Sequence, residues 1–514
     1  MKLTYSQLKN KIAGCWNGKN IGGCLGAPYE GPRKINEVTF YDKKIIDNPP
    51  ANDDLDLQIL WLNAVEKFGK FVNSDILSEY WLSYVIPNWV EYGSAKANLK
   101  MGLKPPFSGI LDNDYHNSNG AFIRSEIWAC LCPGRPDLAA RYAYNDAIID
   151  HGEEGAYAEV FCATIESACF IESDTFNLIN IGLSYIPEDC GCAKAVRLVI
   201  DEYKKGTNWK DLRHKLLSEI TCNFGIQDKD PAVRCNDYPP AAPGYDSPCH
   251  IAFLVLSWLY GEGDFEKSIC LATNLGDDAD CTCATIGSIL GIILGNQALP
   301  EKWVKPLNNK IQTICINVSS IGITAPKTIE EMTDRVLACI PTFLGDKCDL
   351  GYELDKYVVN TVEKDELIFT KTKRLPLIDT NTMQQLYPYE MLRNLSPYAT
   401  VYEFPTFNAV LDYHGENRIS AGETKKVTLT LTDNGILCEQ RWVEVSVFTK
   451  DGLTVGKGKF TACALQVTHD YKAVIEIEFT ASEQFNSAKS EFYIDVQIAN
   501  RQTATVIKGF FLNK

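Results

Sequence analysis

Two short stretches of this chain concentrate carboxylates at the starts of apolar, helix-like segments. The first is Asn52-Asp53-Asp54-Leu55-Asp56, and the second is Asp277-Asp278-Ala279-Asp280. Acidic side chains in a first helical turn are favoured by the helix dipole and by unpaired backbone N–H groups, which would explain either cluster alone. Two matching clusters are harder to explain in this way alone, because packed carboxylates repel one another unless a cation lies between them. Ligand sets made only of oxygen favour Mg²⁺, Ca²⁺ or Mn²⁺ over zinc, so the pattern predicts a site for such a cation.

Glycines recur every four residues in two segments, one near the N-terminus and one after the second acidic cluster. On helices this spacing makes a stripe without side chains, along which another backbone can approach closely. Glycine costs roughly 1 kcal/mol per helix position relative to alanine, so its repetition asks for a packing role. We expect the two segments to pack together and bring residues 277–280 beside the N-terminal segment; a loop over 22–26 is the equally weighted alternative. The glycines concerned are Gly14, Gly18, Gly22, Gly26, Gly287, Gly291 and Gly295.

Three further features are candidate functional residues, but each is weak evidence of function when it is taken alone. Glu30 follows the glycine segment, where a single glutamate is usually solvated. Ser118-Asn119-Gly120 opens a helical run, and it is either an ordinary N-cap or a set of N–H groups presented to an anion. His151 follows Ile148-Ile149-Asp150, where a histidine is more often a structural residue than a catalyst.

The apolar pattern changes period along the chain. Residues 1–345 read mainly as helices, beginning with a Thr4–Gln7 capping box. Beyond them the apolar residues alternate, as in Val427, Leu429 and Leu431, and Asp451-Gly452 is typical of a hairpin turn. The predicted fold class is therefore multi-domain: an all-α domain over 1–345, a connecting segment over 346–396, and an immunoglobulin-like β-sandwich over 397–514.

Composition excludes several classes of function. The chain has 514 residues, with 50 Lys+Arg against 66 Asp+Glu and a formal net charge of −16. Such an acidic chain without a basic cluster argues against direct nucleic-acid binding. Neither a signal-peptide core nor an apolar stretch of the ~20 residues that span a bilayer occurs, so we expect no membrane association. The 19 cysteines read as small buried residues in a reducing cytoplasm.

Together the motifs resemble the ADP-ribosylglycohydrolase family, of the dinitrogenase-reductase-activating-glycohydrolase type. The segment from Gly14 to Glu30 is similar to the family's opening segment, and Asn52-Asp53-Asp54 to its Thr-Asp-Asp metal motif. Asn119-Gly120-Ala121-x-x-Arg124 and the helix carrying His151 are similar to its middle motifs. The stretch from Asn274 to Cys281 is similar to its Gly-Gly-Asp-Thr-Asp-Thr motif. The resemblance covers the helical part only and implies that this part is the catalytic domain.

The sequence departs from the family pattern at several of these positions. Asn52 replaces a threonine but keeps an oxygen ligand, whereas Cys281 replaces the final threonine and loses one. Gly23 stands where the family has an aspartate, and Asp56 and Asp277 are additional carboxylates. These departures indicate a divergent, bacterial-like subgroup whose substrate can differ from ADP-ribosylated protein.

The resemblance implies a hydrolase that cleaves an ADP-ribosyl or related ribosyl glycosidic bond with two Mg²⁺ ions, Mn²⁺ being the alternative. The partner it implies is an ADP-ribose-type small molecule or an ADP-ribosylated substrate, held through its ribose hydroxyls and diphosphate. Implied metal ligands are Asn52, Asp53, Asp54, Asp278 and Asp280, while ligation by Asp56, Asp277 and Cys281 is left open. Implied catalytic residues are Glu30 and Asp54, and implied substrate-binding residues are Ser118, Asn119, Gly120 and His151.

Two other functions remain open at this point. One is a catalytically impaired relative that binds ADP-ribose without turnover, for which Cys281 is the main reason. The other is a Mg²⁺–diphosphate enzyme of the isoprenoid-synthase type, which is also all-α. The first acidic motif of those enzymes has carboxylates at positions one, two and five, whereas Asp53, Asp54 and Asp56 occupy one, two and four.

Overall fold

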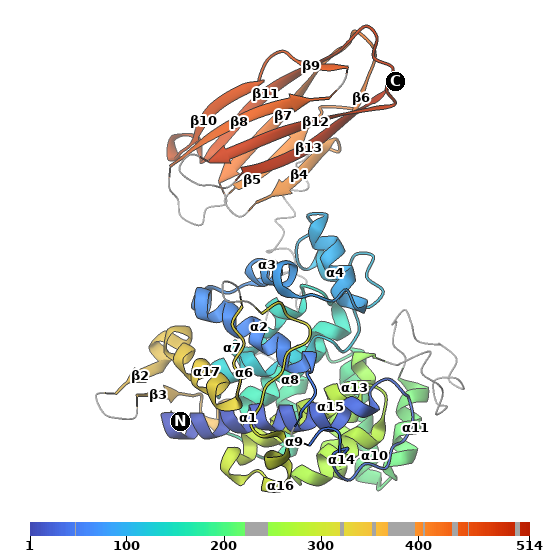
Figure 1. Ribbon diagram of the computed structural model, residues 1–514, viewed down its shortest axis with the longest axis vertical. Coiled ribbons are helices and arrows are strands. Elements are labelled where there is room, and N and C mark those ends of the chain that lie inside the picture. Colours follow the sequence, from blue (N-terminus) through green and yellow to red (C-terminus); the bar gives the residue numbers. More distant parts are fainter. Residues whose placement is uncertain are drawn as a thin grey trace. The chain divides into compact units, whose positions relative to one another are not determined.

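The computed structural model describes the chain except for residues 47, 221–244, 319–322, 352–355, 368–395, 405–406, 434–439, 451 and 499–503. The chain divides into two compact units, Met1–Asp379 and Thr380–Lys514. The first is built mainly of helices and the second of strands, which confirms the predicted fold class (Figure 1). Most of the predicted connecting segment and Asp451 lie outside the described residues. The hairpin predicted at Asp451-Gly452 is wrong, because the strands on either side of it, β8 (Arg441–Thr449) and β9 (Leu453–Val455), belong to different sheets, and β9 pairs with β11 (Lys472–Ala481) instead.

Helix α1 (Tyr5–Gly26) begins at the predicted capping box: the Thr4 side chain accepts the N–H of Gln7, and the Gln7 side chain accepts the N–H of Thr4. The helix continues through Gly26, which excludes the alternative of a loop over 22–26. Each of these caps satisfies a backbone donor that the first helical turn leaves unpaired.

Helices α1 and α15 (Ala279–Leu294) pack backbone against backbone, as the glycine spacing predicts. A Cβ atom on Gly18 would lie 2.0 Å from the carbonyl oxygen of Gly287, and one on Gly14 would lie 2.2 Å from that of Gly291. These distances are shorter than any van der Waals contact, so only glycine fits there. Gly295, the last of the second series, lies just past the end of α15 as its C-cap.

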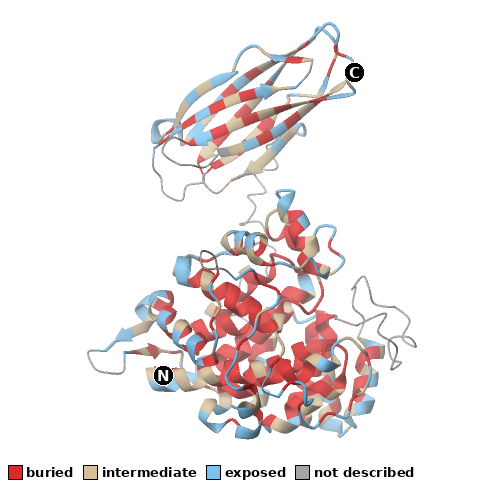
Figure 2. Cartoon of the chain, in the orientation of Figure 1, coloured by how far each residue is buried: buried red, intermediate tan, exposed pale blue. Residues whose placement is uncertain are grey.

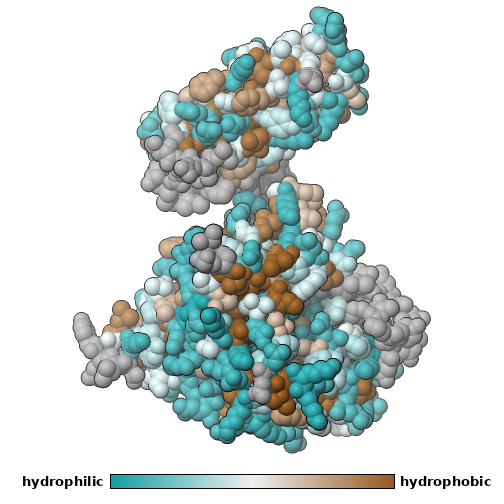
Figure 3. Space-filling view, viewed as in Figure 1, coloured by the Kyte–Doolittle hydropathy of each residue, from teal (hydrophilic) through white to brown (hydrophobic). Residues whose placement is uncertain are grey.

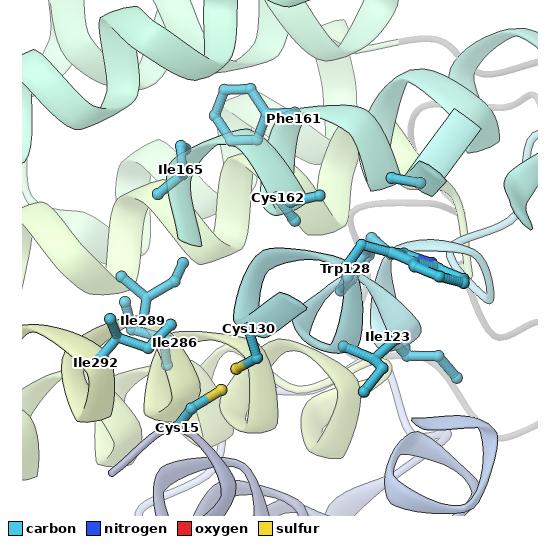
Figure 4. Close-up of a cluster of buried hydrophobic side chains, with 14 of the residues drawn as sticks. Cys15, Ile123, Trp128, Cys130, Phe161, Cys162, Ile165, Ile286, Ile289 and Ile292 are labelled. Carbon is cyan, nitrogen blue, oxygen red and sulfur yellow. The ribbon is translucent and has the colours of Figure 1, made fainter. Parts of the chain in front are cut away.

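The other helices surround this pair and make one apolar core (Figure 2). Figure 4 shows part of that core, where Cys15 of α1 and Cys130 of α6 face each other beneath α8. The remaining helices of the described residues are α2 (Asp53–Phe68), α3 (Ser74–Tyr84), α4 (Val90–Lys100), α5 (Phe107–Ile110), α6 (Glu126–Leu131), α7 (Pro136–Ala147), α8 (Glu153–Ala168), α9 (Thr175–Tyr185), α10 (Gly191–Lys205), α11 (Trp209–Glu219), α13 (Ser247–Tyr260), α14 (Phe265–Leu275), α16 (Glu301–Val304), α17 (Ile329–Leu344) and α18 (Lys364–Leu367).

A small antiparallel sheet of order β1-β3-β2 also belongs to the first unit. Its strands are β1 (Lys2–Thr4), β2 (Cys348–Leu350) and β3 (Tyr357–Asn360). Leu3 pairs with Val359, so residues beyond position 345 complete the helical unit by pairing with its first strand. No helix among the described residues is both long enough and apolar enough to cross a membrane.

The second unit has two five-stranded sheets, of orders β10-β8-β12-β13-β6 and β4-β5-β7-β11-β9. Residues from both sheets form one core, including Val445 and Ile494 from one sheet and Leu429 and Ile477 from the other. Strand residues alternate between this core and an outer surface that mixes hydrophilic residues with exposed apolar ones such as Trp442 and Phe448, which is the inside–outside alternation of a β-sandwich (Figure 3). The strands are β4 (Ala399–Glu403), β5 (Phe407–Asp412), β6 (Arg418–Ile419), β7 (Thr424–Asp433), β8 (Arg441–Thr449), β9 (Leu453–Val455), β10 (Phe460–Leu465), β11 (Lys472–Ala481), β12 (Lys489–Ile498) and β13 (Ala504–Asn513).

Candidate active site

The two acidic clusters lie together because α1, α2 and α15 meet at their ends. A Cβ atom on Gly26, at the end of α1, would lie 2.3 Å from the Cα atom of Asp280, in the first turn of α15. Asn52 caps α2, where its Oδ1 accepts the N–H of Asp54 at 2.7 Å. The Nδ2 of Asn52 donates to Asp280 Oδ2 at 3.2 Å, which links the first cluster to the second.

Two groups of possible ligands form around this junction, and Asp280 belongs to both. One comprises Glu30, Asp278 and Asp280, and the other Asp54, Asp280 and Cys281; within each group the ligand atoms lie within 4.8 Å of one another. Asp54, Asp278 and Asp280 are buried, whereas Glu30 is exposed. Among the described residues no donor reaches Asp54 Oδ2 or Asp280 Oδ1. Buried carboxylate oxygens without donors fit a bound cation, because leaving them unpaired is costly.

The electrostatics of the cluster also fit a cation. The charge of Asp280, followed by burial and the charge of Asp53, raises the pKa of Glu30 to about 8. Burial raises the pKa of Asp54 well above its usual value, against the lowering effect of Lys19, and the charges of Asp280 and Asp53 raise it further. A divalent cation would relieve this repulsion.

Asp56 and Asp277 belong to neither group. Asp56 Oδ2 accepts the N–H groups of Ile314 and Cys315, both at 2.6 Å, and so ties α2 to a distant loop. Asp277 accepts from Arg33 Nε at 3.0 Å, and its carbonyl accepts the N–H of Gly31 at 2.9 Å. Asp277 therefore holds the segment that carries the neighbouring Glu30, although it contributes no ligand atom to either group.

The predicted substrate-binding residues divide into two pairs. Asn119 and Gly120 line the same pocket as the carboxylates, and Asn119 Nδ2 donates to Asp278 Oδ2. Ser118 and His151 lie fully buried behind them, with Ser118 Oγ and His151 Nε2 2.8 Å apart. His151 Nδ1 lies 2.9 Å from Asp150 Oδ1, so a chain of polar contacts leads from the pocket wall into the core.

The pocket has a volume of about 200 Å³. No Lys, Arg or His is found among the described residues of its lining, so direct contacts with an anionic ligand are unfavourable there without a cation. Trp89 adds a ring that is 47% exposed, which suits stacking against a flat group. The lining consists of Glu30, Asp53, Trp89, Val90, Glu91, Tyr92, Asn119, Gly120, Ile123, Tyr245, Asp278, Asp280 and Cys281.

Several residues of the site are absent from the sequence prediction. Tyr92 donates its hydroxyl to Asp53 Oδ2 at 2.9 Å and so holds that carboxylate in place. Lys19 is 1% exposed and pairs with Glu126 Oε1 at 2.8 Å, which puts a buried positive charge behind Asp54. The position of Lys19 among the small and apolar residues of the glycine segment could have indicated that it is buried. Nothing local in the sequence marks Tyr92 or Trp89.

Fold and site together define an α-helical enzyme with a carboxylate-lined pocket. A model of the ADP-ribosylglycohydrolase family matches residues 4–341, which cover nearly all of the helical unit. The chain therefore belongs to the ADP-ribosylglycohydrolase family, a family of glycosyl hydrolases, and the predicted resemblance is confirmed. This membership favours glycoside hydrolysis over the isoprenoid-synthase alternative.

A shorter similarity links the chain to an individual curated protein. It is 41% identical over 49 residues to the ADP-ribosylarginine hydrolase Tri1 of Serratia proteamaculans (strain 568). The aligned segment makes up 10% of this chain and 13% of that protein, so the similarity is confined to a small part of both.

Proposed function

We propose that this chain hydrolyses the glycosidic bond of an ADP-ribosyl group, with ADP-ribosylated arginine as the first substrate to test. Family membership supports the reaction, and the name of the partial relative supports the linkage. The observation that carries the proposal is the grouping of Glu30 with Asp278 and Asp280, whose ligand atoms lie within 4.8 Å of one another. This grouping supports a role for Glu30 as an acid–base carboxyl next to carboxylates that are suited to a cation.

We assign the cation sites to Asp53, Asp54, Asp278 and Asp280 with Asn52, and take two Mg²⁺ ions as the cofactor, Mn²⁺ being the alternative. When bound, these ions would supply the positive charge that lets a diphosphate and ribose hydroxyls approach the acidic pocket. The chain orients its own ligands for this: Tyr92 holds Asp53, and Asn119 holds Asp278.

Glu30 is the proposed acid–base residue. Glu30 lines the pocket, and the contacts of Asp277 with Arg33 and Gly31 hold the backbone on which it stands. There it would orient a water molecule or protonate the leaving group as the ribose carbon gains oxocarbenium character. Asp54 would act with it by fixing the position of the reacting ribose.

Asn119 and Gly120 would contact the nucleotide, since both line the pocket. Ser118 and His151 would support that wall from behind, because both are buried and in contact with each other. Trp89 would stack against the adenine. A cytoplasmic location and the absence of direct nucleic-acid binding remain predictions from composition.

The test is the Mg²⁺-dependent release of ADP-ribose from ADP-ribosylated arginine by the wild type and by Asp278→Asn. We expect the substitution to abolish most turnover, because it removes a carboxylate from the cluster. Asp201→Asn, an exposed position on α10, is the matched control and should be fully active. Undiminished turnover in Asp278→Asn would contradict the assignment of Asp278 to the cation site. Tight binding of ADP-ribose without turnover in the wild type would favour the alternative of a catalytically impaired relative that only binds ADP-ribose.

A further inference from the structure

The two ligand groups that share Asp280 differ in the atoms they offer. Glu30, Asp278 and Asp280 offer oxygen only, whereas Asp54, Asp280 and Cys281 offer two oxygens and one sulfur. Oxygen-only sets suit Mg²⁺, while a cysteine sulfur is a poor ligand for Mg²⁺ and a good one for Zn²⁺ or Co²⁺. Two coordination environments that favour different metals therefore meet at Asp280.

The sulfur of Cys281 is directed at the buried carboxylates. Cys281 lies in the first turn of α15, is 7% exposed, and its Sγ lies 3.3 Å from Asp54 Oδ1. Cys283, two residues further along the same helix, has its Sγ 3.2 Å from the carbonyl oxygen of Ile269 instead. Of these two neighbouring cysteines, only Cys281 belongs to a ligand group.

The carboxylates of this mixed group have unused ligand atoms. Asp54 is 1% exposed and Asp280 is 4% exposed. Asp54 Oδ2 and Asp280 Oδ1 receive no hydrogen bond from any residue that the structure describes. Two buried oxygens without donors next to a sulfur form an incomplete coordination sphere.

Resting on the proposed function, we propose that Asp54, Asp280 and Cys281 bind a divalent transition metal of the Zn²⁺ type through the Cys281 sulfur. Asp278 and Asp280 remain ligands of the Mg²⁺ position beside Glu30, so the transition metal takes the place of one of the two proposed Mg²⁺ ions. The thiol proton of Cys281 passes to solvent when the sulfur binds, since the thiolate is the ligand. The enzyme is thus a mixed-metal member of its family, and its metal preference depends on one side chain.

The test uses Co²⁺ as a spectroscopic probe with the full-length protein. We expect the wild type to show a sulfur-to-cobalt charge-transfer band in the near ultraviolet that reaches saturation at one Co²⁺ per chain. Cys281→Thr should lose this band, and Cys283→Ala, the matched control, should keep it. Circular dichroism establishes that each variant is folded, and Cys281→Ser is the second variant if the threonine is not tolerated.

Calorimetry gives an independent readout. The affinity of the wild type for Zn²⁺ relative to Mg²⁺ should fall about tenfold or more in Cys281→Thr, because a favourable ligand is lost. Absence of the band in the wild type, its persistence in Cys281→Thr, or an unchanged preference would each overturn the inference. If one of these results is found and ADP-ribose release with Mg²⁺ alone is normal, only the transition-metal inference fails and the proposed function stands. If no divalent ion binds or supports turnover, the inference and the proposed function both fail.

Discussion

Gly26 and Asp280 meet where the ends of α1 and α15 come together, so close that a Cβ atom on the glycine would lie 2.3 Å from the Cα atom of the aspartate. The backbone of one helix thus determines where a carboxylate of the other lies. Because Asp280 belongs to both ligand groups, the packing of the two helices and the geometry of the pocket are a single feature of the molecule.

Gly26→Ala should therefore damage stability and site together. The added methyl must separate the two helix ends, at a cost of about 1–3 kcal/mol or more in unfolding free energy. Metal affinity should fall as well, because Asp280 moves. Denaturant unfolding and calorimetry measure both effects, with Gly415→Ala as the control, since a Cβ there has nothing within 4 Å. Normal metal binding in Gly26→Ala would show that the packing of α1 against α15 does not determine the geometry of the metal site.

Asp56→Ala should lower stability without weakening metal binding. The substitution leaves the buried N–H groups of Ile314 and Cys315 without their acceptor, which costs about 2–4 kcal/mol for the pair. Asp56→Asn keeps an acceptor oxygen and should cost less. Thermal unfolding together with Mg²⁺ titration decides the matter, and a large loss of Mg²⁺ affinity would make Asp56 a ligand after all.

Lys19→Met should be strongly destabilising because it leaves Glu126 buried without its cation. Breaking such a pair by removing one partner costs about 3–5 kcal/mol. The double variant Lys19→Met/Glu126→Gln should recover part of this loss, since the uncompensated charge is removed. A double variant as unstable as the sum of the single variants would show that the two residues act independently.

Glu30 should titrate near pH 8 in the metal-free protein, chiefly because of the charge of Asp280. A carboxyl whose folded-state pKa is raised favours the folded state while it is protonated, and this contribution is lost as pH rises from its ordinary pKa of about 4.5 through about 8. Carbon-13 NMR of the Glu30 carboxyl measures the pKa directly. Asp280→Asn should lower it; an unchanged value would assign the shift to burial instead.

Trp89→Ala should raise the KM for an ADP-ribosylated substrate about tenfold and leave kcat nearly unchanged. Stacking on an aromatic ring contributes about 1–3 kcal/mol per base, and the Trp89 ring lines the pocket without being one of the proposed reacting groups. Trp89→Phe keeps a flat ring and should restore most of the affinity. The exposed Trp442 of the second unit offers a control, because Trp442→Ala should change neither constant.

Local patterns predicted much of this structure. Three examples are the capping box at Thr4, the glycine spacing of α1 and α15, and the alternation around Leu429. Each of these patterns depends only on residues that are close together in the sequence. The family motifs marked the two acidic clusters, and the structure brings them together through Asn52 and Asp280.

By itself, the sequence determined the order of helical and β units, the packing of α1 on α15 and the two acidic clusters, because periodicity and spacing are properties of the chain. Only the tertiary structure decided what each acid contacts. Asp54 and Asp56 stand two residues apart in the same cluster, yet one faces Cys281 and the other accepts two backbone N–H groups from a distant loop. A side chain's role depends on its partners in space, and those partners lie more than two hundred residues away along the chain.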